Sequence, residues 1–133
     1  MSKQAAEADR RIENTLLTGK VIEVDAASGK ARVDFGGELE TQLIPWMAQR
    51  AAENHSWWPL QIGEWVMVGA PSGDLAQAVI LGAIPTGTNP PHGAADTFRL
   101  SFAGGSYIEF AGGNITIHAT GDLILQGANV RLN

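Results

Sequence analysis

Three histidines are the first candidates for metal binding or proton transfer in this 133-residue sequence. His55 and His92 lie in segments rich in turn-forming residues, and neither has a second ligand at a metal-binding spacing. His118 falls on the outward side of a strand-like pattern, between Thr116 and Thr120. The sequence has no cysteine, which excludes disulfides and thiolate metal sites. We therefore predict no metal site and no cofactor, and we interpret the three histidines as surface residues.

Catalytic residue patterns are also missing from the sequence. We find no Ser/His/Asp arrangement, no carboxylate pair and no glycine-rich phosphate loop. The dipeptides Gly73-Asp74 and Gly121-Asp122 are turn signals. We predict no catalytic residue and expect a protein that is not an enzyme.

The four tryptophans raise the question of nucleic-acid binding, because exposed aromatic rings can stack on single-stranded bases. Such surfaces combine aromatic with basic residues, yet Arg50 is the only nearby cation, and the formal net charge is −5. We predict that Trp46 and Trp65 belong to a core. Trp57 and Trp58 lie in a loop segment, where we expect them to contact another subunit or a partner protein.

Residues 1–17 predict a short N-terminal helix. Ser2 is a suitable N-cap, and Gly19 lies just beyond the expected end. The apolar stripe is narrow, with Ile12 and Leu16 four residues apart. We therefore expect this helix to dock only against other subunits. The N-terminus lacks the apolar core of a signal peptide, which predicts a protein made in the cytoplasm.

From residue 20 onward the apolar period changes from helical to alternating, with turn residues between the runs. Five short strands separated by turns favour a small Greek-key barrel of the OB type over residues 18–86. The expected strands are residues 20–24, 30–35, 39–46, 65–68 and 78–81. Residues 87–97, which include Asn89-Pro90-Pro91-His92-Gly93, predict a stiff linker.

The last segment, residues 98–133, contains apolar pairs two residues apart that recur about every seven to eight residues, with Gly, Asn and Asp between them. Strands this short cannot build a core alone, and their open edges invite pairing with other chains. Three copies form the narrowest closed prism that such side chains can fill. We therefore predict an obligate homotrimer with a needle-like tail. The predicted trimer core consists of Phe98, Leu100, Phe102, Ile108, Phe110, Ile115, Ile117, Leu123, Leu125, Val130 and Leu132.

Several motifs, taken in order, resemble one known family across nearly the whole chain. They are Thr18-Gly19, Leu43-Ile44-Pro45-Trp46, Arg50-Ala51, Trp57-Trp58, Gly63-Glu64-Trp65-Val66, Ser72-Gly73-Asp74-Leu75 and Asn89-Pro90-Pro91. The sequence resembles the baseplate assembly protein V family, the central tail spike of contractile-tailed phages and R-type pyocins. It is also similar in architecture to the spike part of type VI secretion proteins.

The resemblance implies an all-β protein: a trimeric OB-fold collar that carries an intertwined triple-stranded β-helix. It implies a structural spike in the baseplate of a phage tail or pyocin particle, placed below the tail hub protein. Sheath contraction would drive this spike through the outer membrane of the target cell. The loop residues Trp57 and Trp58 would then contact the hub or another subunit.

The sequence departs from the family at its tip. Longer members end in an apex with a His-x-His pair whose three copies bind one metal ion. Here His118 is the only histidine of the repeat region, and the chain stops at Arg131-Leu132-Asn133. We expect a blunt end capped by a separate, PAAR-like tip protein; the alternative is that the apex is missing from this sequence.

A second function stays open at this stage. An oligomeric OB-fold module that binds single-stranded nucleic acid or oligosaccharide would share the same barrel. The negative net charge disfavours nucleic acid as its ligand.

Overall fold

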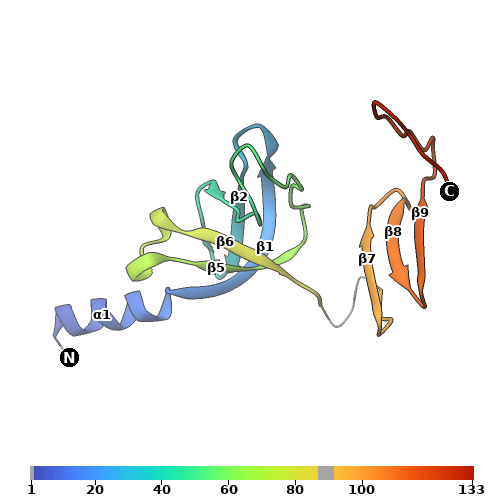
Figure 1. Ribbon diagram of the computed structural model, residues 1–133. Helices are drawn as coiled ribbons and strands as arrows, with labels where there is room; N and C mark the ends of the chain where they lie inside the picture. Colours follow the sequence, from blue (N-terminus) through green and yellow to red (C-terminus); the bar gives the residue numbers. More distant parts are fainter. Residues whose placement is uncertain (1, 87–91) are drawn as a thin grey trace. The chain divides into compact units, whose positions relative to one another are not determined.

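The computed structural model describes residues 2–86 and 92–133, and the chain divides into two compact units, Met1–Pro90 and Pro91–Asn133 (Figure 1). Among the described residues, the first unit holds one α-helix and a six-stranded sheet, and the second holds a three-stranded sheet. Of the predicted linker, residues 87–91 lie outside the described residues. Residues 92–96 contain neither helix nor strand.

Helix α1 (Lys3–Glu13) begins as expected and ends earlier than expected. The Ser2 Oγ accepts a hydrogen bond from the Ala5 N–H at 3.1 Å, which caps the first turn. The helix does not extend to residue 17, because Leu16 and Leu17 already pair with β5 as the start of β1. None of the helices in the described ranges has the length and apolar content needed to span a bilayer.

The first unit is an antiparallel barrel with the strand order β3-β2-β1-β5-β6, and β4 also pairs with β2. Its strands are β1 (Leu16–Asp25), β2 (Lys30–Gly36), β3 (Leu39–Glu40), β4 (Ile44–Pro45), β5 (Trp65–Gly69) and β6 (Val79–Ile84). The predicted strand over residues 39–46 is therefore split into β3 and β4. A parallel bridge between Trp46 and Ile80 closes the barrel, and there the Met47 N–H donates to the Ile80 carbonyl at 2.9 Å. These pairings are those of an OB-type barrel.

The barrel has its own hydrophobic core, built from inward-facing residues of its strands and loops. The buried apolar residues are Val21, Ala31, Val33, Ile44, Val66, Val68, Ala70, Ala78 and Ile80. Trp46 packs against this core, as predicted. Trp65 does not, and that prediction is wrong: its side chain is 41% exposed, because Val66 and Val68 occupy the inward positions of β5.

Gly19 allows close packing inside the barrel and does not mark the end of the helix. It lies in β1, where a Cβ atom would come within 2.7 Å of the Asp34 carbonyl oxygen and of Val33 Cγ1. Cβ atoms do not approach other atoms so closely without displacing them. The glycine is therefore required by the contact between β1 and β2.

The second unit is an antiparallel meander of β7 (Thr97–Ser101), β8 (Tyr107–Ala111) and β9 (Asn114–His118). Gly112 and Gly113 form the turn between β8 and β9, both with positive φ. Residues 119–133 contain no strand in this single chain, and they double back before the C-terminus (Figure 1). The strands predicted at the last two apolar pairs are therefore absent from the described single chain.

We expect Gly19→Ala to destabilise the barrel, because the new methyl group collides with backbone and a β-branched side chain. The free energy of unfolding should fall by about 1–3 kcal/mol, measured by denaturant unfolding of the full chain with tryptophan fluorescence. Gly82→Ala is the matched control in β6, since nothing lies within 4 Å of its added Cβ. Equal effects of the two variants would contradict this packing argument.

Candidate assembly interface

One face of the three-stranded sheet is apolar across all of its strands. Residues directly opposite each other in an antiparallel pair lie on the same face. Phe98 lies opposite Phe110, which lies opposite Ile115 on the next strand. A second row on the same face is formed by Leu100, Ile108 and Ile117, which also lie opposite one another. We call these six residues the apolar spike face: Phe98, Leu100, Ile108, Phe110, Ile115 and Ile117.

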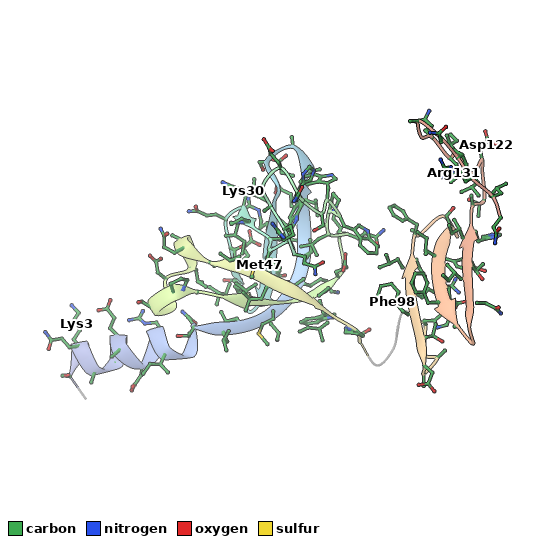
Figure 2. All side chains as sticks on the ribbon, in the orientation of Figure 1. Lys3, Lys30, Met47, Phe98, Asp122 and Arg131 are labelled. Carbon is green, nitrogen blue, oxygen red and sulfur yellow. The ribbon has the colours of Figure 1, made fainter. Side chains whose placement is uncertain are left out.

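The apolar spike face is open to solvent in the single chain. Figure 2 labels Phe98, which belongs to this face. Its exposed fractions run from 39% for Ile108 to 70% for Ile115. The ring centroids of Phe98 and Phe110 lie 5.7 Å apart, so neighbouring side chains of the face contact one another. The face as a whole remains exposed among the described residues. A contiguous apolar patch of this kind is rare on a monomeric protein and marks an interaction surface.

The opposite face of the same sheet carries a connected set of polar and aromatic contacts. The Arg99 guanidinium lies 3.6 Å from the centroid of the Tyr107 ring, and its Nη1 lies 3.4 Å from Glu109 Oε1. The Tyr107 ring stacks on His118 at 5.1 Å. Arg99, Tyr107 and Glu109 are partly buried by these contacts. The polar face is thus better covered than the apolar face, the reverse of a sheet in a globular monomer.

The histidines are dispersed in the structure. His118 stacks on the polar face, and the His92 Nε2 lies 3.8 Å from Glu109 Oε1. His55 belongs to the other unit, where its Nδ1 lies 3.1 Å from the Glu53 carbonyl oxygen. Across residues 2–86 and 92–133, no three His, Cys, Asp or Glu side chains converge on a point that could hold a metal ion.

The remaining residues of the predicted core are also exposed. Phe102 sits in the β7–β8 turn, where its N–H donates to the Ser106 carbonyl at 2.9 Å, and its side chain is 67% exposed. The other four lie on the strandless segment 119–133: Leu123, Leu125, Val130 and Leu132. The structure thus brings six of the eleven predicted residues onto one face. The predicted core does not include Ile124, because alternation along a strand assigns it to the face opposite Leu123 and Leu125. Its side chain is 73% exposed in the structure.

Trp57 and Trp58 lie in the long loop between β4 and β5, as expected. The Trp57 ring centroid lies 5.8 Å from that of Trp46, so this loop is anchored to the barrel. Both side chains remain more than half exposed, at 59% for Trp57 and 52% for Trp58. Large exposed rings on an anchored loop are suited to contact with a protein surface.

Comparison with known proteins places this architecture in a family. Residues 17–84, about half of the 133-residue chain, match the family described as the type VI secretion system/phage-baseplate injector OB domain. This region coincides with the barrel strands β1 to β6.

The chain is also similar to the spike protein of Escherichia phage P2, with 35% identity over 105 residues. That match covers 78% of this chain and 49% of the phage protein, so the chain spans about half the length of this relative. It reaches beyond the barrel, since the barrel match covers only residues 17–84. From its barrel and from these two matches, the chain belongs to the baseplate assembly protein V family.

Proposed function

We propose that the protein is the homotrimeric central spike in the baseplate of a contractile injection machine, either a phage tail or an R-type pyocin. The observation that carries the proposal is the apolar spike face, which a single chain leaves open. The similarity to a phage spike protein supports the same role.

In a trimer, the apolar spike faces of the three copies can cover one another. Each contributes its three-stranded sheet to one side of a prism, with the apolar spike face inward and the polar contacts of Arg99 and Tyr107 outward. The edges of β7 and β9 then pair with neighbouring chains, which removes the open edges that would otherwise favour aggregation. Each aliphatic or aromatic side chain that becomes fully buried contributes about 1.5–3 kcal/mol relative to full exposure.

Further along, the segment 119–133 acquires strand partners only from other copies. In the proposed trimer, its apolar pairs continue the core as an intertwined triple-stranded β-helix. All eleven predicted core residues then point toward a shared axis.

The proposed mechanism is mechanical and involves no catalytic residue or cofactor. Sheath contraction pushes the spike through the outer membrane of the target cell, and inter-chain backbone pairing supplies the stiffness. The barrel collar passes the load from the tail hub protein above to the needle below. A separate, PAAR-like tip protein caps the C-terminal end. The protein is made in the bacterial cytoplasm before it is assembled into the particle.

The packing model is tested by Ile117→Asp. In the trimer this change places three carboxylates at one level of a dry core, and each buried ion carries a penalty of several kcal/mol. We expect the full-length variant to lose its trimeric mass in light scattering. Asn114→Asp is the matched control, because Asn114 lies on the opposite face of the same strand. A trimeric, heat-resistant Ile117→Asp variant would falsify the model.

The contact role of the loop tryptophans is tested by Trp58→Ala. We expect either loss of trimeric mass, which indicates a contact with another subunit, or trimers that no longer enter baseplates, which indicates the hub. Met47→Ala is the control, since Met47 is 59% exposed in the same loop region. Normal trimers that assemble normally would show that Trp58 has no role at an interface.

The competing function is an OB-fold module that binds single-stranded nucleic acid or oligosaccharide, and the charges of the chain oppose nucleic acid. The net charge is −5, so three copies carry three times that charge, and Arg50 is the only basic residue near Trp57 in the sequence. We expect no retention of single-stranded DNA in filter binding at low salt. Binding that appears at low salt and weakens steeply as salt rises would favour the nucleic-acid module instead.

A further inference from the structure

Helix α1 presents an apolar stripe that the described residues of its own unit leave exposed. Ala5, Ala8 and Ile12 follow one another at helical spacing and are all exposed, Ile12 at 72%. The main contact of the helix is with the turn Pro71–Gly73. Ala8 and Ile12 border an open depression next to Ser72, so the stripe stays unfilled there.

A second uncovered apolar surface lies on the outside of the barrel. Trp65 pairs directly with Ile84, so the two side chains share the outer face. The side chain of Leu81 lies 3.3 Å from the position of a Cβ on Gly69, which places Leu81 on the same face. We call this surface the outer barrel patch: Leu16, Trp65, Met67, Leu81 and Ile84. Four of these are 39–59% exposed, and Met67 is partly buried.

Within one chain the stripe cannot reach the far part of this patch. Leu16, the first residue of β1, pairs with Gly69, whereas Trp65 pairs with Lys20. Trp65 therefore lies four residues further along the sheet, about 13 Å at the rise of a β-strand. Helix α1 points away from the start of β1 and does not fold back over the sheet (Figure 1). The uncovered helix and the uncovered sheet face are thus separate in the single chain.

The two surfaces are complementary in size and charge. The stripe begins with two alanines, which let a helix backbone approach a sheet, while the patch is built from bulky side chains that fill such a space. Asp9, four residues after Ala5, borders the stripe, and Lys20 lies beside Trp65 on the outer face. Opposite charges therefore flank two apolar surfaces that each need a cover.

We propose that α1 of each protomer docks on the outer barrel patch of a neighbouring copy. This inference rests on the proposed trimer and names a second contact within it. The contact is heterologous, with different surfaces on the two sides, so three such contacts close a ring. A bundle of the three helices would cover the stripes but leave Trp65 and its neighbours open, and we favour docking on the patch for that reason.

Thiol cross-linking tests the contact directly, because the chain has no cysteine of its own. We would combine Ile12→Cys with Ile84→Cys, and separately with Leu81→Cys, in the full chain. All three positions are exposed, so folding should be preserved. A short bis-maleimide should join different chains, so that at least one pair gives covalent dimers and trimers on a denaturing gel. The expected yield is at least tenfold above that of any single variant.

Two controls make the outcome decisive. Ile12→Cys alone tests the helix bundle, and abundant cross-linking by this variant alone would overturn the proposal. Ile12→Cys with Ile62→Cys tests specificity, since Ile62 is 70% exposed in the loop before β5. Trimeric mass in light scattering without cross-linking of either patch pair would reject helix docking but keep the proposed trimer. A monomeric unmodified chain would reject both.

Discussion

The distribution of apolar side chains over the two faces of the β7–β9 sheet is the constraint from which the proposed assembly follows. The polar face is already covered by contacts among Arg99, Tyr107, Glu109 and His118, whereas the six residues of the apolar spike face are open. A small sheet with one apolar face is stable only when that face packs against something. The described part of this unit offers no such cover, and this supports the proposal that other copies of the chain supply it.

The barrel contrasts with the sheet because it completes its own core. Nine apolar side chains are buried within it, and the bridge between Trp46 and Ile80 closes the strand order into a ring. Thr41 is the buried polar residue of this core; its Oγ1 accepts from the Val33 N–H at 3.0 Å. In the proposed spike, a self-sufficient collar thus carries a tail that depends on assembly. This difference between collar and tail is consistent with the proposed role, in which the collar contacts the tail hub and the tail penetrates a membrane.

Local patterns were enough to predict the barrel and the apolar face of the sheet, and long-range contacts account for the errors. Alternation places Phe98, Ile108 and Ile117 correctly on one face, because a strand offers only two sides. The run Trp65-Val66-Met67-Val68 is apolar on both sides, so alternation could not decide that Trp65 points outward. Gly19 looked like a helix end, since its contact with Asp34 is not visible in the local sequence. Segment 119–133 pairs with no strand among the described residues, and its strands remain a prediction.

The collar and the tail support each other in the proposed trimer. A tail of short repeats has many near-equivalent registers, since shifting one chain by a whole repeat again brings apolar pairs together. If the proposed helix docking joins the collars, it raises the effective concentration of the three tails for one another and favours pairing that starts at β7. The correct register is then favoured by the folded collar rather than by the repeats, which are too similar to encode it. In the proposed trimer, the N-terminal helix thus helps the needle to assemble in register, although the two lie far apart in the sequence.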